Sequence, residues 1–97
     1  MLFRSIARRL RALGVRPDER VGLAVERSTG LIAALLGIMR SGAAYVPLDP
    51  SYPQDRLAHM IEDSAITRVV TDAETADALA GLLEGLDTVM EIGRAHV

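Results

Sequence analysis

The sequence contains no cysteine and no lysine, and only 3% of its residues are aromatic. Without cysteine, disulfides, thiolate chemistry and cysteine-based zinc sites are excluded. Without lysine, any mechanism that needs an ammonium side chain must obtain it from another part of the protein. No apolar run approaches the roughly 20 residues that a membrane-spanning helix needs, so we expect no membrane partner.

The overall composition is that of a soluble globular domain. The 97 residues are 49% apolar and 25% charged, with a net charge of -2, which is enough for one small core and untypical of a disordered chain. The absence of a basic field disfavours nucleic acid as a partner. All 11 basic residues are arginines, which, with many alanines, suggests GC-rich bacterial coding DNA.

The first 14 residues, MLFRSIARRLRALG, are basic and free of acids, as mitochondrial targeting peptides are. They continue without a small-residue cleavage region into a segment typical of a folded domain. We therefore interpret them as a surface helix with solvated arginines, and we expect a cytoplasmic protein.

Helical and strand patterns alternate along the chain. Apolar residues recur at helical spacing in four segments, residues 2–13, 29–40, 57–61 and 73–83. Short apolar runs of strand length lie at residues 21–25, 43–48, 66–70 and 88–92. The alternation predicts the α/β class, with a parallel sheet covered by helices and right-handed crossovers.

Turn and cap residues mark where these elements end. Gly14 and Gly42 stand where helices should terminate, and Ser28 is a natural N-cap for the helix after it. Pro53 fits the first turn of the third helix. Pro47 cannot donate to a sheet, so it marks a strand end or an exposed edge.

The second helix, residues 29–40, is apolar around almost its whole circumference, which predicts burial on more than one side. Gly30 and Gly37 lie within it, where a small residue permits close packing. The methionines are interpreted as core filling; those within the elements are Met39, Met60 and Met90.

Polar residues follow the strands at the edge where parallel sheets bind ligands. These are Glu26-Arg27-Ser28, Asp49-Pro50-Ser51 and Thr71-Asp72. Three acids at one edge could form a metal or phosphoacceptor pocket, but the lysine of such a phosphoacceptor site is absent. Aspartate between a strand and a helix commonly forms a turn or caps the helix, which is the favoured interpretation here.

No catalytic or phosphate-binding motif is recognisable. Gly30, Gly37 and Gly42 have neither the spacing of a dinucleotide fingerprint nor the Gly-Lys ending of a P-loop. His59 falls within a helix, where an exposed or satisfied histidine is expected rather than a ligand or base. We therefore predict no catalytic, cofactor-binding or metal-binding residue, and the residues alone leave the role of the domain open.

Residues 42–50 read GAAYVPLDP and are followed by SYPQDRL. This stretch resembles the second core motif of the adenylation domains of nonribosomal peptide synthetases, which are adenylate-forming, AMP-binding ligases. The flanking segments ALGVRPDERVGLAVERS, LIAALLGIMRSG and IEDSAITRVVTD resemble the same family in order and spacing. The resemblance is close over residues 5–72 and weaker to about residue 91. Acyl-CoA and fatty-acyl ligases share the fold but usually match this stretch less closely.

The resemblance implies that residues 1–91 are a partial adenylation domain, an incomplete piece of the large N-terminal subdomain. The parent enzyme would use ATP and Mg²⁺ to activate an amino acid as aminoacyl-AMP. It would then load the phosphopantetheine thiol of an adjacent carrier domain, with a condensation domain nearby. The phosphate loop, specificity pocket and catalytic lysine of the family match no position here, so we expect this chain to be inactive alone. Two alternatives are a piece of an acyl-CoA or fatty-acyl-AMP ligase and a small non-catalytic α/β binding module.

The resemblance also implies structural roles. Tyr45, Val46 and Leu48 would pack a strand into the subdomain, and the residues Pro47, Asp49 and Pro50 would shape the exit of that strand. Two positions depart from the family pattern. Gly30 replaces a frequent acid near a helix start, and Ala65 replaces a common glycine at the end of the third helix.

Residues 92–97 read IGRAHV, which the DNA ATC GGA AGA GCA CAC GTC encodes. That string resembles a widely used sequencing adapter translated in frame. We interpret residues 92–97 as adapter read-through, and we expect genomic DNA to continue differently after Glu91.

Overall fold

The computed structural model describes residues 2–26 and 29–92. Its four strands form one sheet in the order β2-β1-β3-β4, with every pair parallel. The strands are β1 (Arg20–Ala24), β2 (Ala44–Pro47), β3 (Arg68–Asp72) and β4 (Asp87–Ile92). The helices are α1 (Leu2–Ala12), α2 (Thr29–Arg40), α3 (Gln54–Ser64), α4 (Ala73–Ala78) and α5 (Ala80–Leu83).

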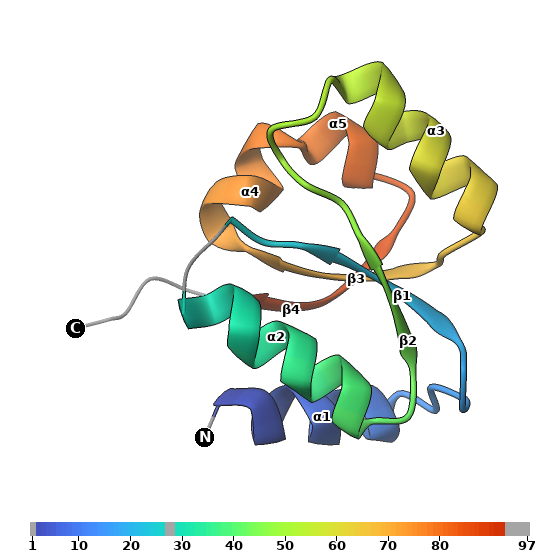
Figure 1. Cartoon of the computed structure of the whole chain (residues 1–97), viewed down its shortest axis with the longest axis vertical. Helices are drawn as coiled ribbons and strands as arrows, with labels where there is room; N and C mark the ends of the chain where they lie inside the picture. The colour runs from blue at the N-terminus through green and yellow to red at the C-terminus, as the bar shows by residue number, and fades with distance from the viewer. Residues whose placement is uncertain (1, 27–28, 93–97) are drawn as a thin grey trace.

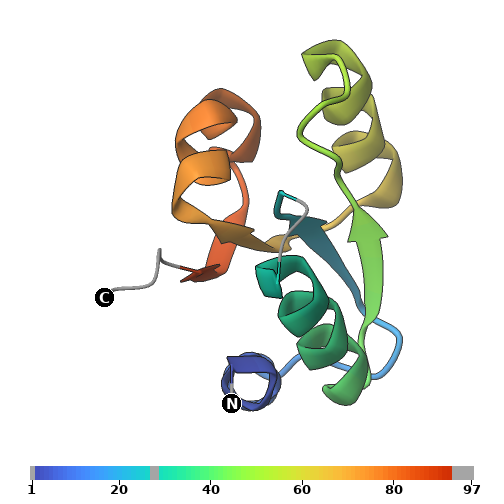
Figure 2. The ribbon, with the colours of Figure 1, turned by 60° about the vertical axis from the view of Figure 1, so that its left-hand side comes forward.

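The helices cover the sheet on both faces. α1 and α2 lie together on one face, and α3, α4 and α5 lie on the other (Figures 1 and 2). This three-layer arrangement confirms the predicted α/β class, and each predicted strand and helix is present within a few residues of its expected bounds. Of residues 92–97, which we interpret as adapter read-through, residues 93–97 lie outside the described part.

Each face of the sheet has its own hydrophobic core. Val21 and Leu23 of β1 pack into the cluster under α1 and α2, while Ala24 belongs to the cluster under α3 and α5. In β3, Val70 packs into the cluster under α1 and α2, and Val69 packs into the cluster under α3 and α5. The two central strands are buried on both faces, and for this reason their buried positions are apolar apart from Thr71.

The helix ends follow the predicted signals with small differences. Gly14 (φ 81°) and Gly42 (φ 92°) adopt the left-handed backbone expected of helix-terminating glycines. Pro53 lies one residue before α3 instead of within its first turn. The predicted helix over residues 73–83 is divided into α4 and α5 at Leu79, whose backbone leaves the helical region. The predicted N-cap Ser28 lies outside the described residues.

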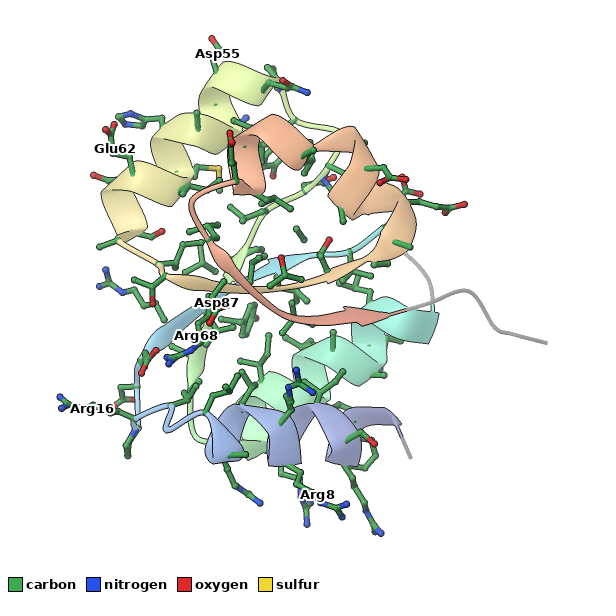
Figure 3. The ribbon with its side chains drawn as sticks, turned by 180° about the vertical axis from the view of Figure 1, so that it is seen from behind. Arg8, Arg16, Asp55, Glu62, Arg68 and Asp87 are labelled. Atoms are coloured by element: carbon green, nitrogen blue, oxygen red, sulfur yellow. The ribbon has the colours of Figure 1, made fainter. Side chains whose placement is uncertain are left out.

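At the amino end of the sheet, Arg68 joins three segments. Its Nη1 donates to Glu19 Oε2 at 2.5 Å, and its Nη2 donates to the carbonyl oxygen of Leu13 at 3.2 Å. The side chain therefore links the start of β3 to the loop before β1 and to the end of α1 (Figure 3). This cross-link lies at the edge opposite to the carboxyl ends of the strands, where a ligand site is expected.

Two of the packing predictions are wrong. Met39 is exposed instead of filling the core. Tyr45 is also exposed in this chain, and its packing into the whole subdomain stays a prediction. The expectation that α2 is covered on more than one side is wrong as well, because Ile32 and Leu36 are exposed with Met39. Met60 does pack against the core as predicted, and the side chain of Met90 lies outside the described part.

Close packing at Gly37 is confirmed. A Cβ atom at this position would lie 2.7 Å from Ile6 of α1, so only glycine allows the observed approach of α1 and α2. Across the described residues, no helix is long and apolar enough to cross a membrane.

Candidate functional site

A hollow of about 580 Å³ lies beyond the carboxyl ends of β1 and β2. This is the edge where open parallel sheets bind ligands, as the sequence predicted. Its lining residues come from β1 and the residues after it, from α2, and from the exit of β2: Leu23, Val25, Glu26, Leu31, Pro47, Leu48, Asp49, Pro50 and Ser51.

The exit of β2 is fixed by hydrogen bonds of the motif residues. Leu48 N donates to Leu23 O at 2.9 Å, which keeps the chain attached to β1 just beyond Pro47. Asp49 Oδ1 then accepts from Ser51 N at 3.0 Å and from Ser51 Oγ at 2.8 Å. This is an aspartate turn of the kind predicted for the strand end. The predicted packing of Leu48, and the role of Asp49 in shaping the exit, are therefore confirmed.

The third acid of the predicted edge, Asp72, has a different environment. Its Oδ1 accepts from Thr75 N at 2.6 Å and caps α4, while its Oδ2 accepts from Glu26 N at 3.2 Å. The capping role is therefore confirmed, and Asp72 also holds the backbone that follows β1. Asp72 does not line the hollow, so the structure brings together two of the three acids there, Glu26 and Asp49. Arg27 and Ser28 lie outside the described residues.

The buried Thr71 links the strand that carries Asp72 to its neighbour. Thr71 Oγ1 donates to Ala24 O at 2.7 Å, which ties β3 to β1 at the carboxyl edge. Thr75 is buried in the first turn of α4. The hydrogen bond of Thr71 is structural, and neither threonine is among the described residues that line the hollow.

The charge of the lining limits what the hollow can bind. Among the described residues, its lining carries the carboxylates of Glu26 and Asp49 and includes no arginine or histidine. A nucleoside triphosphate needs positive charge or a row of amide donors at its phosphates. Within the described ranges, no group of three His, Asp or Glu residues could hold a metal ion. The described lining residues therefore supply no cation to the phosphates of ATP.

The other candidate residues do not complete a catalytic set. His59 is exposed on α3, as predicted, and α3 contributes no residue to the hollow. Ser51 donates to Asp49 instead of meeting a histidine. The absence of catalytic and cofactor-binding residues in the whole chain stays a prediction.

The apolar part of the hollow is not predicted by the sequence. Leu23, Val25 and Leu31 are recognisable as core residues of a strand and a helix, but not as a shared surface. The only sequence pattern that could have indicated this apolar lining is the pair of apolar runs in which these residues lie. These runs do not show which of their residues remain uncovered, because that depends on how α2 packs across the sheet.

Relatives of known sequence carry the same segment. The family model of AMP-binding enzymes matches residues 2–95. A linear gramicidin synthase of Brevibacillus parabrevis is 57% identical over 75 residues, which is 77% of this chain and 1% of that protein. The AMB antimetabolite synthetase AmbB of Pseudomonas aeruginosa is 47% identical over 78 residues, 80% of this chain and 6% of the relative.

Solved structures show the same fold within larger enzymes. The nonribosomal peptide synthetase FmoA3, bound to α-methyl-L-serine-AMP, matches 92% of this chain with a TM-score of 0.82 and 32% identity. The four-domain synthetase AB3403, bound to AMP and glycine, matches 94% with a TM-score of 0.72 and 41% identity. The chain covers only 10% and 6% of these two chains.

The sequence resemblance to adenylation domains of peptide synthetases is thereby confirmed. The β2 motif and the elements around it match these proteins both in sequence and in backbone geometry. The chain belongs to the family of AMP-binding enzymes.

Proposed function

We propose that this chain supplies one α/β unit of an adenylation domain in a nonribosomal peptide synthetase. The parent enzyme would join the carboxylate of an amino acid to the α-phosphate of ATP, with release of pyrophosphate. The aminoacyl group would then pass to the phosphopantetheine thiol of a carrier domain, with release of AMP. The observation that carries the proposal is the 57% identity to the linear gramicidin synthase over 75 residues.

The role of this unit is structural. β2 and the aspartate turn at its exit hold the motif AYVPLDP against β1, and no step of the reaction is assigned to a residue of this chain. Mg²⁺, the carrier and condensation domains and the catalytic groups would belong to other parts of the parent. The proposal includes a cytoplasmic location, where ATP is available.

Acyl-activating ligases share the architecture at lower identity. The fatty acid AMP ligase of Legionella pneumophila matches with a TM-score of 0.71 and 28% identity, and MatB of Rhodopseudomonas palustris with 0.73 and 26%. The higher identity to peptide synthetases favours an amino acid over a fatty acid as the parent's substrate.

A segment exchange tests this proposal. Residues 2–91 would replace the matching segment in the adenylation domain of the linear gramicidin synthase. We expect the chimera to keep amino-acid-dependent exchange of pyrophosphate into ATP within about tenfold of the host, because core residues of matching pattern and volume are interchangeable at small cost.

The matched control inserts the corresponding segment of the Legionella fatty acid AMP ligase into the same host. If this chain restores exchange no better than that control, the peptide-synthetase assignment is wrong.

A further inference from the structure

The two helical layers of the chain carry charges of opposite sign. The helices α1 and α2 contain only arginines among their charged residues: Arg4, Arg8, Arg9, Arg11 and Arg40. The helices α3 and α4 contain mainly acids: Asp55, Glu62, Asp63, Glu74 and Asp77, with Arg56 as their one arginine. All of these side chains are exposed. Since the sheet lies between the two layers (Figures 1 and 2), one face of the molecule is basic and the opposite face is acidic.

Three arginines of α1 form one stripe along the helix. Arg4, Arg8 and Arg11 are spaced by four and three residues, which places them on one side of α1. At a rise of about 1.5 Å per residue, the stripe is about 10 Å long. The side chain of Arg11 also donates to Arg40 O at 2.8 Å, which holds this end of the stripe beside the C-terminus of α2. We call Arg4, Arg8 and Arg11 the arginine stripe.

The outer side of α3 carries acids at the same spacing. Asp55 and Glu62 are as far apart in sequence as the two ends of the arginine stripe, and His59 lies between them on the same side of the helix. Figure 3 shows Asp55 and Arg8 at opposite ends of the molecule, each pointing away from the sheet. We call Asp55 and Glu62 the acidic stripe. The arginine stripe and the acidic stripe therefore match in length and are opposite in charge.

We propose that the chain associates head to tail with a second copy of itself, with the arginine stripe of one copy against the acidic stripe of the next. Equal spacing lets both ends of the two stripes pair at once, and complementary charge of this kind fixes partner and orientation. A second copy is the acidic partner whose spacing the structure itself provides. Because the stripes lie on opposite faces of the sheet, the contact is heterologous and adds further copies instead of closing in a dimer. The inference does not depend on the proposed function.

Sedimentation equilibrium of the 97-residue chain tests the contact. Exposed ion pairs are individually weak, so association requires low salt and high protein concentration. At about 20 mM salt, where screening is weak, we expect the average mass to rise above the monomer mass of 10.4 kDa and then beyond the dimer. Raising the salt to about 0.5 M shortens the Debye length about fivefold and should weaken association at least about tenfold. A monomer under both conditions would overturn the inference. So would association that persists at 0.5 M salt, because an apolar contact through the exposed Leu36 resists salt.

Arg4→Glu reverses the charge at one end of the arginine stripe. Like charges would then face each other across the contact, and we expect association at low salt to weaken at least about tenfold. Arg16→Glu is the matched control, because it makes the same change of net charge at an exposed position in the loop after α1 (Figure 3). We expect this control to associate within about twofold of the unchanged chain, since it leaves the stripe intact. Equal losses in both variants would show that net charge alone governs association and would overturn the stripe contact.

Glu62→Arg reverses the acidic stripe in the same way, and mixing the two variants completes the test. An acid in the first turn of α1 and an arginine in the last turn of α3 both suit the helix dipoles, so Arg4→Glu and Glu62→Arg should fold. We expect each variant alone to be monomeric at the concentrations used. An equal mixture should regain association, because the first variant keeps the acidic stripe and the second keeps the arginine stripe. A mixture that stays monomeric, although the unchanged chain associates, would overturn the inference.

Discussion

Ala65 shows how a single backbone angle affects stability. It ends α3 in the left-handed conformation, with φ 57° and ψ 33°, and its N–H donates to Glu62 O. A side chain with a Cβ atom is strained there, whereas glycine is not. We expect Ala65→Gly to raise the free energy of unfolding by about 1 kcal/mol. Urea denaturation of the 97-residue chain would measure this as a higher midpoint at constant slope.

The same substitution within α3 should have the opposite sign. Ala58 lies in the middle of the helix and is exposed, so Ala58→Gly loses helix propensity and should lower stability by about 1 kcal/mol. A loss of stability at both positions would show that residue 65 does not hold the left-handed conformation in solution.

At the scale of elements, the contact between α1 and α2 depends on Gly37. A Cβ atom there would lie 2.7 Å from Ile6 Cβ and 2.9 Å from the carbonyl oxygen of Phe3. The backbone carbonyl cannot turn aside, so the helices must separate. We expect Gly37→Ala to lower the free energy of unfolding by about 1 to 3 kcal/mol, despite a gain in helix propensity of about 1 kcal/mol.

Gly81 in α5 provides the comparison, because nothing lies within 4 Å of a Cβ atom built there. Gly81→Ala should leave the thermal midpoint unchanged or raise it slightly. If Gly37→Ala is as harmless as Gly81→Ala, the close approach of α1 and α2 is not maintained.

The sequence specified the elements better than their surroundings. The alternation of helical and strand periods located all four described strands, because each contains a short apolar run between helical segments. The conformation of Ala65 had only one signal, the glycine common at that position in the resembled family. No sequence signal indicated the exposure of Met39, because periodicity shows that a helix is apolar all round but not which neighbours cover it.

The same limit applied to the candidate site. The carboxyl edge was predictable from topology, and the turn role of Asp49 and the capping role of Asp72 from their positions after strands. The apolar lining of the hollow was not predictable, because Val25 and Leu31 come from different elements that meet only in the folded chain.

For the molecule as a whole, the distribution of charge argues against catalysis by this chain alone. Adenylate formation builds negative charge on a phosphate, which a site stabilises with cations or oriented amides. The sequence has no lysine, and the described residues that line the hollow at the carboxyl edge include no arginine or histidine. We expect the purified 97-residue chain to show no exchange of pyrophosphate into ATP with any proteinogenic amino acid. The chimera that carries the same residues provides the positive control under identical conditions. Exchange that rises with the concentration of the free chain and disappears in Glu26→Gln would contradict this prediction and place ATP at the hollow.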